Sequence, residues 1–498
     1  MPRTLLREPS RAIAEFRLLP GLTTDRTSVE RIDLKTRLAL LPRGNGFIHL
    51  NVPMVSAAMQ AVSGTEMGTH LAREGGLAFL FSSQTPENQA KMVAKIKNHK
   101  AGFVKPQTIH PDVTISELAK RRKTLGFSIF PVVNDDNVLL GMISKNDYEE
   151  SVHGSLRVSD RMIPRGQLVV GQNLTDLRKA NDILIESHHG VLPILDNDGK
   201  LVSLVFRKDI HNHLHHPFEV IDDQKRLLAA AALNTHDHTE RLPLLVEAGV
   251  DIVCIDSSDG HAEYQRRVIE WIRSSYPDLP VVGGNIITGA GFQFLVDSGA
   301  CAVKIGMGGG SICITQEQKG TGRGLGTAII EVVQARDAYF QKTGAYIPLI
   351  ADGGIGTGKD IVIALALGAD VVMLGRYFAR FEESPTEKIN IKNRVMKPYW
   401  GEGAPRAREW RERRYRQDNF AEGVEGYVEY AGSLHDNLVE TLAKVRSTFS
   451  TCGVATIAEL HENAVVEVVS GLSIREGRVH DIHLPEGDSA LETRDWGA

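Results

Sequence analysis

The chain has 498 residues, of which 42% are hydrophobic and 24% are charged, and its formal net charge is −5. This composition is typical of a globular protein with about two to four domains. The negative charge argues against extensive nucleic-acid binding, and no apolar run is long enough to cross a membrane. Because the N-terminus also lacks an apolar signal segment, we expect a cytoplasmic protein.

Four cysteines are scattered along the chain, at Cys254, Cys301, Cys313 and Cys452. They form no CxxC pair, and they are too few for a disulfide framework in a chain of this length. Their spacing therefore predicts neither structural disulfides nor a zinc site.

Two apolar runs, Val52–Met59 and Gly76–Phe81, are the first predicted strands. Continuous apolar runs of this length are typical of parallel strands that are buried on both faces. We therefore expect an α/β fold, and we assign residues 1–103 to the first part of its main domain.

Residues 127–148 and 189–210 are two copies of one pattern. Each copy is predicted to form a strand, a polar turn, a second strand and a short polar segment that ends in aspartate. Pro131 matches Pro193 with an offset of 62 (193 − 131), and the closing aspartates at 147 and 209 have the same offset (209 − 147), so the copies align without a gap. The repeat resembles a tandem pair of CBS motifs, also called a Bateman domain, and we assign residues 104–215 to it as an insert.

That resemblance implies a regulatory module that binds adenine or guanine nucleotides. The family's ribose contact, a hydroxyl three residues before an aspartate, is present as Ser144 and Asp147. The second copy keeps Asp209 but has Phe206 in place of the hydroxyl, and so departs from the family's pattern. A purely structural role is the alternative. The histidine-rich exit, residues 211–216, is interpreted as a polar linker rather than a metal site.

Six more apolar runs follow the insert and alternate with helical stretches such as Thr239–Ala248 and Lys359–Leu367. The predicted strands are Leu228–Leu233, Val250–Asp256, Pro280–Gly284, Ala302–Ile305, Pro348–Asp352 and Val371–Leu374. With the first two they make eight, the strand number of a (β/α)8 TIM barrel. A doubly wound open sheet is the alternative, because strand count alone does not prove closure. Residues 216–498 would form the second part of the barrel, including a segment at about 383–432 after the last strand.

Glycines and polar residues gather where the last five of these strands end, in the segments 256–260, 283–285, 306–313, 352–356 and 375–377. A barrel of this kind places its active site at the carboxyl ends of the strands, so the pattern favours an enzyme. The richest segment has four glycines within residues 306–310 and is followed by Cys313. Glycine backbones approach ligands closely, and outward amides there favour a thiolate nucleophile. A buried cysteine after a glycine-rich turn is the alternative.

The segments 306–315, 351–355 and 256–258 resemble the motifs of the inosine-5′-monophosphate (IMP) dehydrogenase family. The resemblance covers nearly the whole chain, including a CBS pair inserted after the second barrel strand. It implies NAD-dependent oxidation of IMP to xanthosine 5′-monophosphate through a covalent cysteine thioimidate, in guanine nucleotide biosynthesis. The chain has no GxGxxG strand–turn–helix unit, as expected of a barrel that binds NAD without a Rossmann domain.

The resemblance also implies roles for individual residues. Cys313 is the nucleophile, Thr315 and Glu422 are a proton relay, and Arg414 with Tyr415 activates water from a mobile flap. The implied substrate contacts are Ser56, Met59, Asn285, Ser311, Asp352, Gly353, Gly354, Gly375, Arg376, Tyr399, Gly401, Glu402 and Gly403. The implied cofactor contacts are Asp256, Ser257, Ser258, Gly306, Met307 and Gly308. Trp400, Glu402 and Ala404 depart from the family's usual Tyr-Arg-Gly-Met-Gly-Ser segment.

A potassium site is implied as well. Its ligands would be backbone carbonyls of Gly308, Gly310 and Cys313, with Glu476, Gly477 and Arg478 of a neighbouring subunit completing the set. Arg478 stands where a glycine is expected. An interchain site requires an oligomer, and the family forms homotetramers.

Three alternatives remain at the level of sequence. GMP reductase shares the barrel, the cysteine and the threonine, but it deaminates GMP with NADPH and has no use for a water-activating flap. The pair Arg414–Tyr415 therefore favours the dehydrogenase. A catalytically idle CBS-type nucleotide sensor would not need the full set of reactive residues, and an FMN-dependent barrel oxidoreductase would not require a thiol in this loop. Acidic residues dilute the arginine-rich run 406–416, so nucleic-acid binding is not expected.

Overall fold

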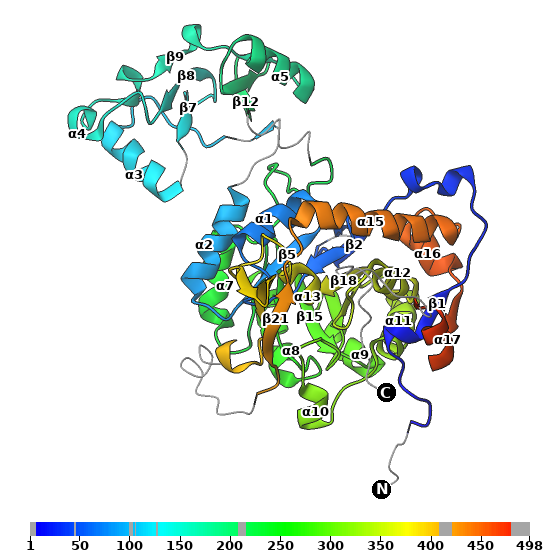
Figure 1. Ribbon diagram of the computed structural model, residues 1–498. Coiled ribbons are helices and arrows are strands. Elements are labelled where there is room, and N and C mark those ends of the chain that lie inside the picture. Colours follow the sequence, from blue (N-terminus) through cyan, green and yellow to red (C-terminus); the bar gives the residue numbers. More distant parts are fainter. Residues whose placement is uncertain are drawn as a thin grey trace. The chain divides into compact units, whose positions relative to one another are not determined.

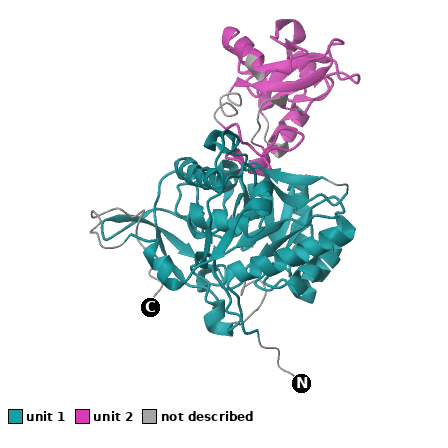
Figure 2. Ribbon diagram, turned by 90° about the vertical axis from the view of Figure 1, so that its right-hand side faces the viewer, with its two compact units in different colours: residues 1–71, 76–93, 229–498 teal, residues 72–75, 94–228 magenta. Residues whose placement is uncertain are grey.

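The computed structural model describes residues 6–43, 46–98, 103–104, 106–125, 128–207, 216–407 and 421–479. The chain divides into two compact units (Figure 2). The barrel unit comprises residues 1–71, 76–93 and 229–498, and the inserted unit comprises residues 72–75 and 94–228. The flanks on either side of the insert therefore fold as one body.

Eight parallel strands close into a barrel in the first unit (Figure 1). In order around the barrel they are β13 (Ala230–Leu233), β14 (Ile252–Ile255), β15 (Val281–Ile286), β16 (Ala302–Ile305), β17 (Leu349–Asp352), β18 (Val371–Leu374), β4 (Met54–Ser56) and β5 (Leu77–Leu80). Closure is made by β5 and β13, where Phe79 lies opposite Ala230 and Leu80 opposite Ala231. The predicted (β/α)8 barrel is confirmed, and the open sheet is excluded.

Helices follow the barrel strands along the chain. They are α1 (Thr65–Arg73), α2 (Pro86–Lys97), α7 (His238–Glu247), α8 (Glu263–Ser275), α9 (Gly289–Asp297), α11 (Leu325–Thr343), α12 (Gly358–Ala366) and the short α13 (Arg376–Ala379). Helices α7 and α12 each begin and end one residue before their predicted limits. Thr357 explains the start of α12, because its side chain accepts a hydrogen bond from the backbone N–H of Asp360. Two C-terminal helices, α15 (Leu434–Thr451) and α16 (Ile457–Asn463), pack against α12.

Three small antiparallel sheets accompany the barrel. One pairs β1 (Phe16–Leu18) with β22 (Val466–Val468), and a second pairs β2 (Thr36–Leu40) with β3 (Phe47–Leu50). The third joins β19 (Ile389–Ile391), β20 (Arg394–Trp400) and β21 (Glu425–Glu429), within the predicted segment after the last barrel strand. Residues 408–420, between β20 and β21, lie outside the described residues, and so do Arg414 and Tyr415.

The two repeat copies of the inserted unit fold alike. In the first copy β7 (Ile129–Val133) pairs with β8 (Leu139–Ser144), and in the second β11 (Val191–Leu195) pairs with β12 (Leu201–Phe206). Pro131 lies opposite Met142 in the first copy, and Pro193 lies opposite Leu204 in the second. Each residue of the second pair is 62 positions after its counterpart in the first (193 − 131 and 204 − 142). The structure thus reproduces the sequence repeat in the register of its strands.

The described part of this unit also contains further strands and helices. Among them are β6 (Phe103–Val104), α3 (Ile115–Leu125), α4 (Glu150–His153), β9 (Ile163–Pro164), β10 (Gly171–Gln172) and α5 (Leu177–Glu186). Helix α5 begins three residues after Leu174, where the helical pattern of the second copy begins in the sequence. In the first copy the Asp147 carboxylate accepts a hydrogen bond from the backbone N–H of Ser144, which closes a turn after β8.

A hydrophobic cluster joins the copies. It contains Val133, Leu139 and Met142 of the first copy and Leu195, Leu201 and Leu204 of the second, each pair again 62 residues apart. Val138 and Lys200, which are also equivalent positions, bridge the copies as an antiparallel pair. Phe206, which replaces the expected hydroxyl, packs against this cluster.

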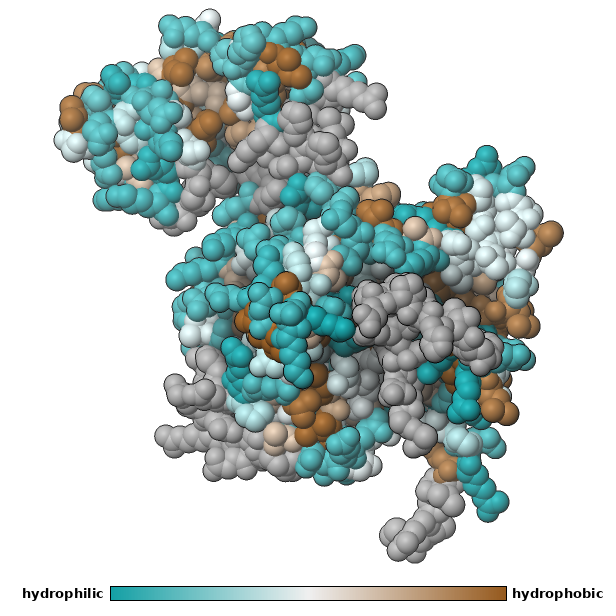
Figure 3. Space-filling view, viewed as in Figure 1, coloured by the Kyte–Doolittle hydropathy of each residue, from teal (hydrophilic) through white to brown (hydrophobic). Residues whose placement is uncertain are grey.

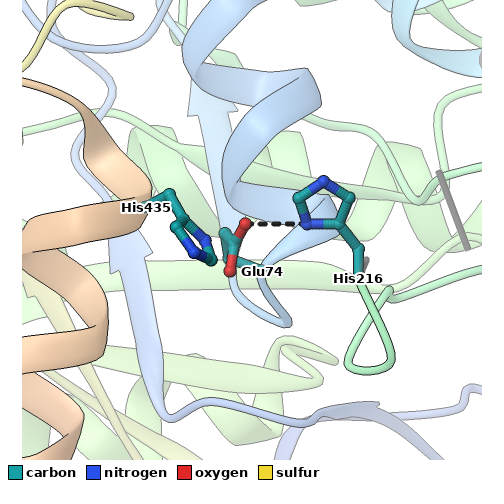
Figure 4. A group of neighbouring side chains, drawn as sticks. All are labelled: Glu74, His216 and His435. Atoms are coloured by element: carbon teal, nitrogen blue, oxygen red, sulfur yellow. Dashed lines mark ion pairs between the residues drawn. The ribbon is translucent and has the colours of Figure 1, made fainter. Parts of the chain in front are cut away.

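The exit of the insert contributes one described histidine, because residues 208–215 lie outside the described residues. His216 Nδ1 lies 2.8 Å from Glu74 Oε1, and the two side chains point toward one another (Figure 4).

On the face that Figure 3 shows, hydrophilic residues predominate and hydrophobic residues lie in separate groups. Among the described residues, no helix combines the length and apolar character needed to cross a bilayer.

Candidate active site

A cavity of about 700 Å³ opens at the carboxyl ends of the barrel strands. Its walls come from the loops after β4, β14, β16, β17 and β18 and from Asn285 near the end of β15, together with residues 399, 401–403 and 422–423 beside the third small sheet. Most residues that the sequence predicts for the site line this cavity: Met59, Asp256, Ser257, Ser258, Asn285, Gly306, Met307, Gly308, Gly310, Ser311, Cys313, Thr315, Asp352, Gly353, Gly354, Gly375, Arg376, Tyr399, Gly401, Glu402, Gly403 and Glu422.

The glycine-rich loop after β16 passes close to the end of β17. A Cβ at Gly306 would lie 2.0 Å from the Asp352 carbonyl oxygen, and Gly306 has φ +136°. Only glycine fits this conformation and this approach. The loop then turns into the short helix α10 (Thr315–Lys319), with Cys313 just before it.

Cys313 differs from the other three cysteines in its accessibility. It is partly exposed in the cavity, whereas Cys254, Cys301 and Cys452 are buried. Burial raises the pKa of Cys254 to about 12 and also raises the pKa of Cys301 and of Cys452. Because a thiolate is the nucleophilic form, Cys313 is the cysteine suited to covalent chemistry.

A chain of polar atoms leads away from the Cys313 sulfur. Cys313 Sγ lies 3.2 Å from Thr315 Oγ1, and the Thr315 hydroxyl donates a hydrogen bond of 3.2 Å to Glu422 Oε2. Residues 312–314 and 422–424 lie side by side, because Ile314 N donates a hydrogen bond to Glu422 O and Val424 N donates one to Ile312 O, both at 3.0 Å. The structure thus brings together the three predicted residues of the relay.

Asp352 ends β17 and faces the cavity beside Asn285. Asn285 Nδ2 donates to Asp352 Oδ2 at 2.8 Å and to the Gly306 carbonyl at 2.9 Å, so Asn285 joins the ends of three strands. Burial raises the pKa of Asp352, while Lys304 and the Asn285 hydrogen bond oppose that shift without cancelling it. A carboxylate held in this way suits the paired hydroxyls of a ribose.

Tyr399, Ser311 and Gly375 meet at another part of the wall. The Tyr399 hydroxyl is hydrogen-bonded to Ser311, and a Cβ at Gly375 would lie 2.8 Å from the Tyr399 oxygen. Burial raises the pKa of Tyr399 to about 12, so the phenol remains a neutral donor at physiological pH. Hydroxyls and a glycine backbone, with Arg376 beside them, match the requirements of a phosphate.

The residues that depart from the family's pattern contact the loop after β4. Glu402 Oε1 accepts a hydrogen bond of 2.7 Å from the backbone N–H of Gln60, and Trp400 Nε1 donates one of 3.0 Å to Gln60 Oε1. Gln60 Nε2 in turn donates to the Ser83 carbonyl at 2.9 Å. Trp400 and Glu402 therefore anchor the segment 399–403 to two barrel loops.

Some predicted residues lie elsewhere. Ser56 is fully buried behind the cavity wall, with its hydroxyl 2.6 Å from that of Ser63, and is not among the lining residues. Glu476 ends α17 (Gly471–Glu476), which packs near residues 13–15, so residues 476–478 do not reach the glycine-rich loop of the same chain.

Lys304 lines the cavity and was not predicted as a site residue. It lies in β16 and is only 3% exposed. Burial alone would lower the pKa of Lys304, but Cys254, Asp352 and Asp256 together raise it. Since Cys254 is a neutral thiol at physiological pH, we attribute the rise mainly to the two carboxylates. A signal was present in the sequence, because a lysine in an apolar parallel strand is rare unless it is paired.

The closed (β/α)8 barrel, with an accessible thiol, a hydroxyl and carboxylates in one cavity at the carboxyl ends of its strands, has the architecture of a barrel enzyme. Residues 13–480 match the family model described as IMP dehydrogenase / GMP reductase domain. The chain belongs to the IMP dehydrogenase / GMP reductase family.

Individual relatives support this assignment. The chain is 48% identical over 489 residues to inosine-5′-monophosphate dehydrogenase of Tritrichomonas foetus, covering 95% of this chain and 96% of that protein. It is 36% identical over 450 residues to the protein of the same name from Escherichia coli K12, covering 88% and 90%. Among solved structures, a Trypanosoma brucei GMP reductase in complex with guanosine 5′-monophosphate matches with a TM-score of 0.77 and 26% identity, covering 96% of this chain and 98% of that one.

Proposed function

We propose that this chain is an NAD-dependent oxidoreductase that converts IMP to xanthosine 5′-monophosphate. The main support is the Cys313–Thr315–Glu422 chain of contacts at one wall of the cavity. Asp352 and the Ser311–Tyr399 pair line other parts of the same cavity. A purine nucleoside monophosphate has matching parts: an electrophilic base carbon, two ribose hydroxyls and a phosphate.

The reaction has two chemical steps. The Cys313 thiolate adds to carbon 2 of the hypoxanthine, and the hydrogen of that carbon leaves as hydride, so that a thioimidate remains on Cys313. Water then adds to the same carbon, the carbon–sulfur bond breaks, and the thiolate is regenerated. IMP, NAD⁺ and water yield xanthosine 5′-monophosphate, NADH and one proton.

Several polar groups that line the cavity suit NAD. Asp256, Ser257 and Ser258 follow β14 and line the cavity with Gly306, Met307 and Gly308. These residues would hold the nicotinamide side of NAD⁺, which supplies the hydride acceptor. The Asp256 carboxylate and the serine hydroxyls match the hydroxyl and amide groups of that half of the cofactor.

A potassium ion suits the carbonyls of Gly308, Gly310 and Cys313, because backbone oxygens are the ligands that hard cations prefer. The Gly308 carbonyl accepts a hydrogen bond from Gln316, and the Gly310 carbonyl accepts one from the Cys313 N–H, which leaves each oxygen a second lone pair. Glu476, Gly477 and Arg478 of a neighbouring subunit would complete the site, so we also propose a homotetramer. The ion would fix the loop that carries Cys313.

The second step needs a base for water. We assign this role to Arg414 and Tyr415, with the Thr315–Glu422 relay as a second proton route. Arginine is an unusual base because its pKa exceeds about 12, so this role requires close, desolvated packing of a flap that enters the site after NADH leaves.

For the inserted unit, we propose that its first copy binds an adenine or guanine nucleotide through Ser144 and Asp147 and regulates the barrel. The cytoplasm, where the substrate nucleotides are made, is the proposed location.

GMP reductase is the second candidate, since the structural relative from Trypanosoma brucei carries that name. The 48% identity to an IMP dehydrogenase favours oxidation over deamination.

The test is purified enzyme mixed with IMP and NAD⁺, with NADH followed by its absorbance. We expect NADH formation, and we expect Cys313→Ala to reduce it by at least about 10³-fold, because the covalent route is lost. Consumption of NADPH with GMP, without NADH formation from IMP, would establish the reductase instead.

A further inference from the structure

Helix α10 carries two polar side chains on one face. Thr315 is its first residue and Lys319 its last, and residues four apart on a helix are neighbours on its surface. Thr315 is buried, whereas the Lys319 side chain is 36% exposed at the edge of the site. The helix therefore presents a hydroxyl and an ammonium to the same neighbour.

That neighbour is the carboxylate of Glu422. Its Oε2 accepts the Thr315 hydroxyl at 3.2 Å, and its Oε1 lies 2.6 Å from Lys319 Nζ. The Glu422 backbone is also held at both polar groups, by Ile314 N at 3.0 Å and by the Gly403 carbonyl at 3.1 Å. Only the side-chain torsions of Glu422 remain free for Lys319 to fix.

A glutamate side chain loses conformational entropy when it is held in one geometry. A charge-assisted hydrogen bond to one oxygen offsets this loss and directs the other oxygen to a fixed place. Here the second oxygen is the acceptor for Thr315, so the Thr315 proton points away from the sulfur and toward Glu422.

We propose that Lys319 is a positioning residue for the hydrolytic half-reaction, an inference that rests on the proposed function. On the Thr315–Glu422 route, as the water oxygen bonds to carbon 2 of the thioimidate, its proton passes to Thr315 Oγ1 while the hydroxyl proton of Thr315 passes to Glu422. The carbon–sulfur bond then breaks with its electron pair on Cys313, and Glu422 releases the proton to solvent. Lys319 touches neither the substrate nor the reacting atoms and acts through Glu422.

The test separates the two half-reactions by stopped-flow measurement of NADH. Lys319→Met keeps the length of the side chain and removes its charge. We expect the steady-state kcat to fall about 10-fold, a part of the 10²–10⁴-fold that acid–base catalysis typically contributes. The first-turnover rate of NADH formation and the KM for IMP should change less than about 2-fold, and Lys319→Arg should recover at least half of kcat.

A matched control is Lys444→Met. Lys444 Nζ also lies 2.6 Å from a glutamate, Glu440 of the same helix, but neither residue lines the cavity. This variant should keep the wild-type kcat, which would separate the position of Lys319 from the general loss of a surface ion pair.

A double mutant tests the route of action. In a Glu422→Gln background, Lys319→Met should change kcat less than about 2-fold, because it acts through the group already altered. Equal losses in the first turnover and the steady state, an unchanged kcat, or a full 10-fold loss on top of Glu422→Gln would each overturn the inference. Wild-type enzyme that forms no NADH would overturn the proposed function and this inference with it.

Discussion

Strand β17 has a cluster of charged side chains at each end, and the two clusters are completed in different ways. At its amino end the Leu349 N–H donates to Asp370 Oδ2 at 2.8 Å, and Tyr346 donates to the other oxygen at 2.8 Å. Arg336, 4% exposed, donates to the Tyr346 oxygen at 2.6 Å and lies 3.4 Å from Asp370. At its carboxyl end Asp352 has Asn285 and Lys304 beside it, and its carboxylate faces a cavity.

The electrostatics follow this difference. Burial alone would lower the pKa of Arg336, but Tyr346 and Asp370 raise it, so the amino-end pair is charged and matched within the protein. Burial raises the pKa of Asp352 because its partners do not fully compensate for lost water. One end of the strand is thus satisfied by the fold, while the other keeps acceptor capacity for a ligand. We therefore predict that mutations at the amino end lower stability with little effect on activity, whereas mutations at the carboxyl end lower activity without lowering stability.

The largest effect is expected at the amino end. Asp370→Asn removes a carboxylate that accepts hydrogen bonds from Leu349 N and Tyr346 and lies 3.4 Å from the buried Arg336 guanidinium. Because Arg336 keeps Asp337 at 2.6 Å, we expect a loss at the lower end of the about 3–5 kcal/mol that is typical of a broken buried ion pair. The urea midpoint of the barrel should fall, while kcat/KM of the folded enzyme should stay within about 2-fold of wild type. Tyr346→Phe removes two hydrogen bonds, one to Asp370 and one from Arg336, but it keeps the carboxylate, and it should destabilise by only about 1–3 kcal/mol. An unchanged midpoint in Asp370→Asn would contradict the comparison.

The opposite pattern is expected for Asp352→Asn. Loss of charge-assisted bonds to the ribose hydroxyls should lower kcat/KM for IMP about 100-fold, since each such bond contributes about 1.5–3 kcal/mol. The unfolding midpoint should stay constant or rise, because the buried carboxylate is held at a cost to stability. A clear loss of stability in this variant would show that Asp352 serves the fold rather than the ligand.

The smallest expected effect is a shift in the pH dependence of kcat/KM. With a raised pKa in the folded state, Asp352 binds its proton more tightly there than in the unfolded chain. Stability contributed by this group therefore falls as pH rises from the unfolded pKa through the folded one. Activity needs the ionised form, so kcat/KM should decline on acidification at a pH above the ordinary aspartate value of about 3.9. Profiles measured from pH 4 to 8 should show this limb in wild type and lack it in Asp352→Asn.

The sequence predicts the barrel well because each strand is a local apolar run between helices and its limits depend on neighbouring residues. Closure was not predictable from such runs, because it joins residues 79 and 230 across the whole insert. The same limit applies inside the strands. Both faces of a barrel strand are buried, so the apolar run around Ser56 does not reveal that this side chain is fully buried and does not line the cavity.

The site, like the barrel, has some features that depend on neighbouring residues in the sequence and others that depend on residues far away in it. Glycines after β16 and β17 mark the loops in the sequence itself, and Cys313 follows from them. The environment of Lys304 could not be predicted, since it depends on carboxylates at positions 256 and 352 that folding brings near it. The anchoring role of Gln60 likewise depends on residues more than 300 positions away.

The hydrophobic cluster shared by the two copies of the inserted unit has a consequence for how that unit evolves and folds. Because Leu139 and Leu201 are equivalent and pack in one cluster, a chain cut between the copies would expose half of that cluster on each fragment. The duplicated halves are consequently no longer independent modules. Ser144 and Phe206 stand at equivalent positions of the two copies and differ, and because Phe206 packs against the shared cluster, a change at such a position also changes the contact between the copies.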